Sequence, residues 1–282
     1  MLKDYKMYRY TSIGRPLDPA YPSNKAVLII LPLAAILGAL VTWKSGGAGL
    51  DLLSNAVSFL LIAFGTWALA RELFPDDSPA AFISMGLGLV AALSFESPGI
   101  LILFTTLGLV RMVNRSTGLL ARKSDSILVM LLVFAVIYST ASPFFGAVAA
   151  LAFILDGSLK EPLRHQWVFG LICFGGMIVY MVDHDVGLGY FSAPNTLLEW
   201  LSVAVLLILA LDMLLLKEVR ARADTKNKRL DLGRVKGGMA VVLLAAILGL
   251  VVLQNVILLV MSVAGIGIGM AFRKAFQAPA AG

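Results

Sequence analysis

The chain has 282 residues, of which 59% are hydrophobic and only 14% are charged. Soluble domains carry about 25% charged residues, and a mean hydropathy of +0.90 excludes disordered chains, fibres and nearly all soluble globular folds. The composition therefore predicts an integral membrane protein. The single cysteine, Cys173, excludes an internal disulfide and a multi-cysteine metal site.

Ten apolar runs, bounded by charged or turn residues, predict ten helices. They lie near residues 26–43, 50–70, 80–95, 98–110, 126–141, 143–155, 166–182, 196–216, 238–253 and 256–271. The runs at 50–70 and 196–216 have the length of about 20 residues that a bilayer crossing needs. We therefore expect an all-α polytopic bundle of about ten transmembrane helices, with residues 26–272 forming a single transmembrane domain.

The distribution of lysine and arginine predicts the orientation. With a cytoplasmic N-terminus and ten crossings, 22 of the 23 basic residues lie on the cytoplasmic side, and only Lys44 lies outside. The positive-inside rule therefore predicts an N-in, C-in protein with cytoplasmic segments at 1–25 and 273–282. We expect a prokaryotic cytoplasmic (inner) membrane. The net charge of +6 is explained by this rule and predicts no nucleic-acid partner.

Three stretches are short for the two crossings that each must make, namely residues 80–110, 126–155 and 238–271. Each arm has about 15 residues, or about 22 Å of helix, whereas the hydrocarbon core is about 30 Å thick. Two alternatives stay open at this point. The arms are either short, closely packed crossings or re-entrant hairpins that turn inside the membrane.

Each short pair turns at a polar break, and these breaks supply candidates for a transport site. The polar groups are Glu96, Ser142 and Asn255. Paired short segments interrupted by proline or glycine indicate a transporter site, although tight extracytoplasmic turns explain the same pattern. Asp212 joins the candidates because an ionisable residue inside a span indicates function. Its alternative role is an ion pair with the adjacent basic loop.

The connection after residue 110 contains Arg111, Asn114 and Arg115 near a glycine. Arginine forks, polar side chains and backbone amides suit a phosphate or a lipid headgroup. The alternative is an ordinary positive-inside loop, in which Ser124 or Asp125 caps the next helix.

A second cytoplasmic connection holds the adjacent carboxylates Asp76 and Asp77. Such a pair could bind Mg²⁺ that also holds a phosphate. The alternative is helix capping by Asp77 or Ser78, with Pro79 at the first helical position. If these carboxylates converge with Arg111 and Arg115, the four groups would form an enzyme site for a phosphorylated lipid.

The loop at 217–236 carries eight basic and three acidic residues. We expect the preceding helix to continue through about Ala223. A polybasic stretch beside a membrane is attracted to anionic lipid by about 1 kcal/mol per residue, and it suits an acidic partner protein equally well. Further along, Gly265 and Gly269 permit close helix packing, within the bundle or between protomers.

The size, the ten spans and the N-in, C-in orientation resemble those of the drug/metabolite transporter group, whose chains are two inverted five-helix halves. The resemblance covers topology alone, and the short pairs here do not follow a five-plus-five repeat. We expect a small-molecule or lipid transporter, or another lipid-handling protein, of unknown substrate. One alternative is a membrane-embedded enzyme that acts with Mg²⁺ on a phosphorylated or isoprenoid lipid at the cytoplasmic face. Another is a non-catalytic subunit of a membrane complex. Assembly into a homo-oligomer or a membrane complex stays open in each case.

Overall fold

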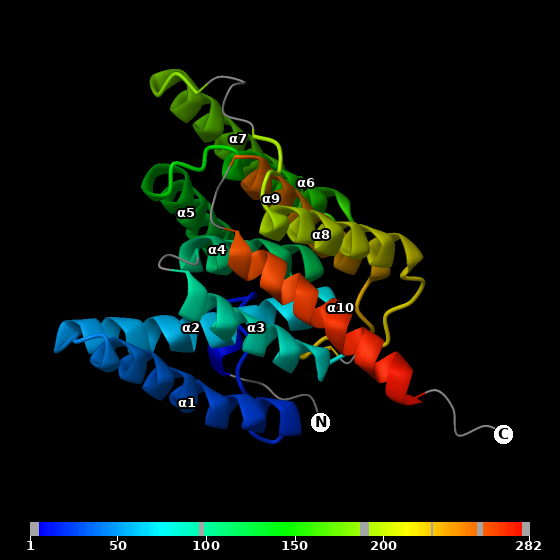
Figure 1. Ribbon diagram of the computed structural model, residues 1–282. Helices are drawn as coiled ribbons and strands as arrows, with labels where there is room; N and C mark the ends of the chain where they lie inside the picture. The colour runs from blue at the N-terminus through cyan, green and yellow to red at the C-terminus, as the bar shows by residue number, and fades with distance from the viewer. Residues whose placement is uncertain (1–5, 96–98, 187–191, 227, 253–255, 278–282) are drawn as a thin grey trace. The chain divides into compact units, whose positions relative to one another are not determined.

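The computed structural model describes residues 6–95, 99–186, 192–226, 228–252 and 256–277, and in these residues it is all helical (Figure 1). The ten α-helices are α1 (Pro22–Lys44), α2 (Leu50–Leu73), α3 (Ala80–Ser94), α4 (Ile100–Asn114), α5 (Lys123–Ser139), α6 (Phe145–Ser158), α7 (Gln166–Asp183), α8 (Leu197–Leu215), α9 (Leu232–Val251) and α10 (Ile257–Gln277). A 3-10 helix, η1 (Lys6–Arg9), precedes them. The described residues contain no strand, so the all-α prediction is confirmed for this part of the chain.

Every predicted apolar run contains one helix. The largest differences are that α9 begins at Leu232 rather than at 238 and that α10 ends at Gln277 rather than at 271. The early start of α9 has a local cause, because the Asp231 side chain accepts a hydrogen bond from the backbone N–H of Arg234 at 3.1 Å. An aspartate in this position satisfies one of the free donors at a helix start.

Five helices, α1, α2, α7, α8 and α9, are long and apolar enough to cross a membrane. Three shorter helices, α3, α4 and α6, are also apolar, as is the part of α10 at residues 257–271. These lengths are compatible with an integral membrane protein. Ten crossings stay a prediction, as does the choice between short crossings and re-entrant hairpins.

The chain leaves α8 at Leu215, so the predicted helical extension through Ala223 is wrong. Residues 216–231 instead form an irregular hairpin, which we call the basic hairpin. The N–H of Ala223 donates to the carbonyl of Lys228 at 2.9 Å across it. Val219 and Ala223 are buried in this arrangement. The hairpin is favoured over a helical extension because it pairs backbone hydrogen-bonding groups and also buries these apolar side chains.

The chain divides into two compact units. Unit 1 comprises Met1–Arg15 and Leu101–Val256, and unit 2 comprises Pro16–Ile100 and Ile257–Gly282. Of the three predicted short pairs, only α5 and α6 belong to one unit, where they pack on each other. The helices α3 and α4 fall in different units, as do α9 and α10. Whether both units form one transmembrane domain stays a prediction.

Small residues hold unit 2 together. Helix α3 packs on α10 and α2, and α2 packs on α1. A side chain added at Gly265 would collide with the backbone of Ser84, and one added at Gly269 would lie 2.6 Å from the Ala80 Cβ. The Ser84 hydroxyl donates to the carbonyl of Ser262 at 2.7 Å. The predicted close packing at Gly265 and Gly269 therefore occurs within the bundle, between α10 and α3.

Helix α6 is the centre of unit 1, where it packs on α5, α7 and α9. Gly146 lets α6 approach α7, because an added Cβ would lie 2.6 Å from the Cys173 carbonyl oxygen. Phe153 on the same helix is fully buried.

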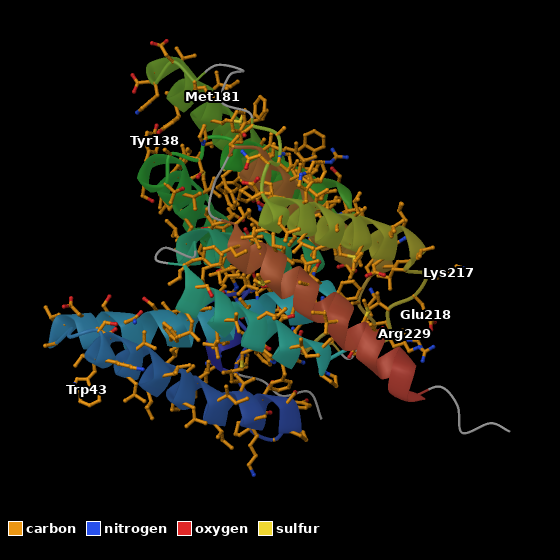
Figure 2. The ribbon with its side chains drawn as sticks, viewed as in Figure 1. Trp43, Tyr138, Met181, Lys217, Glu218 and Arg229 are labelled. Carbon is orange, nitrogen blue, oxygen red and sulfur yellow. The ribbon has the colours of Figure 1, made fainter. Side chains whose placement is uncertain are left out.

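The two ends of unit 1 differ in chemistry. Figure 2 shows Tyr138 and Met181 at one end of the unit, and Lys217, Glu218 and Arg229 at the other. The second end gathers most of the charged contacts described below.

Candidate functional site

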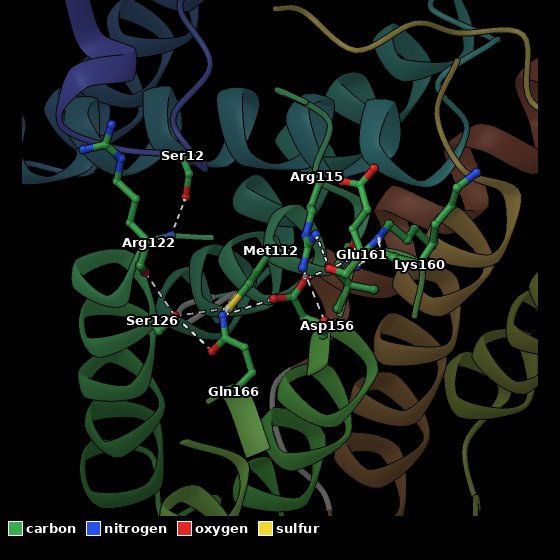
Figure 3. A network of polar contacts seen from close by, with 11 residues as sticks. Ser12, Met112, Arg115, Arg122, Ser126, Asp156, Lys160, Glu161 and Gln166 are labelled. Atoms are coloured by element: carbon green, nitrogen blue, oxygen red, sulfur yellow. Dashed lines mark hydrogen bonds and ion pairs between the residues drawn. The ribbon is translucent and has the colours of Figure 1, made fainter. Parts of the chain in front are cut away.

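A buried polar cluster in unit 1 surrounds Asp156, in the last turn of α6 (Figure 3). Its side chain is fully buried, and both neighbouring guanidiniums are nearly so, at 7% exposed for Arg115 and 5% for Arg234. Arg115 Nη2 lies 2.7 Å and Arg234 Nη1 2.8 Å from Asp156 Oδ1. Burying a carboxylate is tolerable here because two charges of opposite sign face it at hydrogen-bond distance.

The other donors of both arginines end on backbone carbonyls. Arg115 Nη1 donates to the Glu161 carbonyl at 2.8 Å. Arg234 donates through Nε and Nη2 to the Lys160 carbonyl at 3.1 and 2.6 Å, and through Nη1 to the Val113 carbonyl at 2.8 Å. These contacts hold the end of α4, the end of α6 and the start of α9 together.

The second oxygen of Asp156 faces a neutral partner. Gln166 Nε2 donates to Asp156 Oδ2 at 3.1 Å, and Ser126 Oγ donates to Gln166 Oε1 at 3.0 Å (Figure 3). Gln166 and Ser126 are both fully buried. The first turns of α5 and α7 are thereby joined to the same cluster, and each oxygen of the carboxylate has a donor.

Burial and the neighbouring charges together change the pKa of Arg115. Burial lowers the pKa of its guanidinium, the nearby charge of Asp156 raises it, and that of Arg234 lowers it again, leaving the pKa below its usual value. Arginine stays ionised in proteins even so. The cluster therefore contains two cationic guanidiniums and one buried carboxylate.

A cavity of about 320 Å³ lies beside this cluster. The ends of α4 and α6, the basic hairpin and the start of α9 form its wall. The wall residues that matter for charge are six basic side chains and two acidic ones: Arg115, Lys160, Lys226, Lys228, Arg229, Arg234, Glu161 and Asp231. The buried Asp156 adjoins two of them, so basic groups exceed acidic groups by three. The cavity is thus strongly electropositive.

The exposed cations of the wall are held loosely. Lys228 Nζ lies 3.3 Å from Glu161 Oε1, and Lys160 Nζ lies 3.8 Å from Asp231 Oδ2. All four of these side chains are substantially exposed, and pairs of this kind contribute about 0–1 kcal/mol. Hydrogen bonding to Lys228 also lowers the pKa of Glu161. An anion can therefore replace Glu161 and Asp231 as the partner of these lysines at a small cost in free energy.

The backbone of the wall is strained at two places. Arg115 and Glu161 adopt φ values of 49° and 58°, in the left-handed region that favours glycine. Each such residue costs on the order of 1–3 kcal/mol and persists only where its surroundings fix it. Here the fixing contact is their mutual hydrogen bond from the Arg115 guanidinium to the Glu161 carbonyl. Strain of this kind is concentrated at functional sites in proteins.

The N-terminal segment binds the same end of unit 1. Ser12 donates its N–H to Asp125 Oδ2 at 2.6 Å, and its carbonyl accepts the Thr117 hydroxyl, also at 2.6 Å. The predicted helix cap at Ser124 or Asp125 is wrong, because Arg122 holds the N-cap position of α5 and no side chain caps it. Asp125 is used instead to anchor a segment more than one hundred residues away.

A second contact joins the N-terminal segment to the basic hairpin. Arg15 donates to both carboxylate oxygens of Asp224 at 2.8 Å, and the Tyr8 hydroxyl donates to the same carboxylate at 3.2 Å. The hairpin also contacts the loop after α4, since the Thr225 hydroxyl donates to the Thr117 carbonyl at 2.6 Å. Segments that the charge pattern predicts to be cytoplasmic are therefore bonded together at one end of the unit.

The predicted headgroup residues are partly brought together. Asn114 and Arg115 line the cavity, whereas Arg111 Nη1 donates to the Ile13 carbonyl at 3.5 Å. The guanidinium of Arg115 is directed at Asp156 and the Glu161 carbonyl. Direct headgroup binding by these three residues stays a prediction.

The predicted carboxylate pair, Asp76 and Asp77, lies in the turn between α2 and α3 of unit 2. Pro79, rather than Asp77 or Ser78, holds the N-cap position of α3. Convergence with the arginines of unit 1 stays a prediction. In the part of the chain that the structure describes, no three histidine, cysteine or acidic side chains form a group that could hold a metal ion.

The structure describes two of the four predicted transport-site residues. Ser142 is buried in the turn between α5 and α6, where its hydroxyl is 2.7 Å from that of Thr140. Asp212 is half-buried in the last turn of α8. Glu96 and Asn255 lie outside the described residues. A shared transport site therefore stays a prediction.

Sequence reasoning missed the central pair, Asp156 and Arg234. The position of Asp156 along the chain was a clue to its role. It is a lone carboxylate at the end of an apolar run, and a charge buried there needs a partner. The partners lie 41 and 78 residues away, at Arg115 and Arg234. No spacing rule for one helix or one loop connects such distant positions.

No family model, curated protein or solved structure matches this chain significantly.

Proposed function

We propose that the protein is a multi-pass membrane protein of the lipid-handling class that binds an anionic headgroup in the unit 1 cavity. The observation that carries the proposal is the excess of basic side chains around a cavity at the ends of apolar helices. Basic side chains beside a membrane are attracted to anionic lipid by about 1 kcal/mol per residue. A volume near 320 Å³ is at the lower end for ligand sites and suits a headgroup.

The proposal includes ten crossings with both termini in the cytoplasm. Support comes from the positive-inside distribution and from contacts among the segments predicted to be cytoplasmic. The N-terminal segment contacts the loop after α4 and the basic hairpin, and the loop after α4 contacts the loop after α6. The cavity then faces the cytoplasm, at the level of the headgroups of the inner leaflet. The end of unit 1 that carries Tyr138 and Met181 faces outward (Figure 2).

Cysteine labelling tests the orientation. Asp183→Cys at the outward end should react with a membrane-impermeant maleimide in intact cells, and Lys217→Cys should react only after permeabilisation. Cys173 is buried and gives a low background. Labelling of Lys217→Cys in intact cells would contradict the proposed topology.

Lipid retention tests the function. The cavity variant replaces three exposed basic residues of the wall, Lys226→Ala, Lys228→Ala and Arg229→Ala. Protein purified from membranes with mixed neutral and anionic lipids should retain an anionic lipid in native mass spectrometry. The cavity variant should lose it.

A matched control separates the cavity from general surface charge. The control variant removes three basic residues of the same region that do not line the cavity, Lys217→Ala, Arg220→Ala and Lys236→Ala. It should retain lipid like the unmodified protein. Equal retention by all three proteins would refute the proposed site.

A further inference from the structure

Resting on the proposed function, we infer that the unit 1 cavity selects a headgroup that ends in a phosphate monoester or a diphosphate. Such a group carries about 1.5 to 2 or more negative charges near pH 7. A phosphodiester headgroup carries a single negative charge. Charge and donor number at the cavity both favour the more highly charged group.

The net charge of the cavity favours a multiply charged headgroup. The wall presents six basic and two acidic side chains, and the adjacent Asp156 leaves basic groups in excess by three. A singly charged phosphodiester leaves most of this excess uncompensated. A doubly charged phosphate compensates two of the three excess charges, and a triply charged diphosphate compensates all three. The attraction between charges rises in proportion to their product.

The number of hydrogen-bond donors at the cavity also favours a terminal phosphate. Within the described part of the chain, the side chains of Lys226 and Arg229 make no hydrogen bond or ion pair, although both line the cavity. Lys160 and Lys228 face only exposed carboxylates, at 3.8 and 3.3 Å. Four cationic side chains are thus available to the ligand. A terminal phosphate offers three acceptor oxygens to them, whereas a phosphodiester offers two that are unesterified.

Arg115 and Arg234 form a rigid part of the cavity wall. Arg115 and Arg234 have their donors on Asp156 and on backbone carbonyls. These two guanidiniums supply fixed positive charge and hold the wall segments in place, and the flexible side chains of the basic hairpin supply the direct contacts. A fixed field with adjustable donors discriminates by charge more than by headgroup shape.

The source of the phosphate is a lipid. Leu211, Leu214 and Leu215 are exposed on the last turns of α8, the helix that continues into the basic hairpin. An acyl chain can lie on this apolar surface while its headgroup enters the cavity. A soluble phosphate shares the headgroup chemistry and gains nothing from this surface.

A titration tests the inference. Purified protein in a neutral detergent is titrated with phosphatidic acid, a phosphate monoester, and with phosphatidylglycerol, a phosphodiester of matched acyl chains. The protein should bind phosphatidic acid about tenfold or more tightly. The cavity variant should lose this preference, and the control variant should keep it. Lys226→Arg with Lys228→Arg preserves every charge and should also keep it.

The outcomes separate the two proposals. Equal affinity for the two lipids, with both weakened in the cavity variant, overturns the monoester inference and leaves the proposed function standing. Failure of the cavity variant to weaken either lipid overturns both. Inorganic phosphate or pyrophosphate that competes at the same concentration as phosphatidic acid overturns the assignment to a lipid. Competition only at about a hundredfold higher concentration supports it.

Discussion

Units 1 and 2 are both helical and apolar, but the contacts that stabilise unit 1 internally differ from those that stabilise unit 2. Unit 2 packs α10 on α3 through Gly265 and Gly269, where helix backbones approach closely. Unit 1 places a fully buried carboxylate, Asp156, between Arg115 and Arg234 at the ends of its helices. Close packing needs only small residues, whereas the buried cluster needs three charged groups from distant parts of the chain.

The difference shows what each kind of contact is suited to do. Small-residue packing fixes the bodies of helices and leaves their surfaces apolar. The cluster of unit 1 fixes loops, because the arginines bind the Glu161 and Lys160 carbonyls beyond the end of α6. Ordered loops with unpaired positive charge are suited to bind an anion, and we therefore propose the binding site in unit 1.

The largest expected effect is in unit 1. Asp156→Asn leaves two buried guanidiniums without their counter-ion, and breaking a buried pair in this way costs about 3–5 kcal/mol. Thermal unfolding in detergent should show a large fall in stability. Asp183→Asn removes an exposed carboxylate of the same unit and should change stability little. Equal effects of the two changes would contradict the special role of the cluster.

In unit 2 the matching change is Gly265→Ala. The added methyl group collides with the backbone of Ser84 and should cost about 1–3 kcal/mol through overpacking. Gly86 in α3 has open space at its Cβ position. Gly86→Ala should therefore be neutral or stabilise by up to about 1 kcal/mol, because alanine favours the helix. Equal destabilisation by both substitutions would refute the packing account of unit 2.

A smaller effect is expected where the N-terminal segment meets the basic hairpin. Arg15→Ala removes a two-point ion pair with Asp224, which is partly exposed, and should cost about 1 kcal/mol or less. Hydrogen exchange should become faster in residues 216–231. Arg9→Ala serves as the control, because Arg9 binds Arg122 through its backbone carbonyl, which the substitution keeps. Unchanged exchange in Arg15→Ala would show that the segment does not hold the hairpin.

The smallest effect concerns pH. Lys228 lowers the pKa of Glu161 below its usual value of 4.5 in the folded protein. The stabilisation from this pair is therefore present above pH 4.5 and is lost as the pH falls through the lower, folded value. The difference in unfolding temperature between the protein and Lys228→Ala should shrink in this acidic range. For Lys217→Ala it should stay constant.

The helices were predictable because an apolar run with charged ends has few alternatives in this composition. The hairpin at 216–231 was not, since the burial of Val219 and Ala223 depends on contacts outside the run. Asp125 reads locally as a helix cap but is bound by Ser12. The cavity was also not predictable from local sequence. Its loops were correctly marked as basic, and their meeting depends on Asp156, whose partners are distant in sequence.

The central claim is that unit 1 binds an anionic lipid at its basic cavity, and photo-crosslinking tests it most directly. Phosphatidic acid with a photoreactive group near its glycerol is incorporated into membranes that contain the protein, and the labelled peptides are mapped by mass spectrometry. The account predicts labels in residues 156–166 and 211–234, reduced in the cavity variant and kept in the control variant. Labels confined to unit 2, for example in residues 71–80, would contradict it.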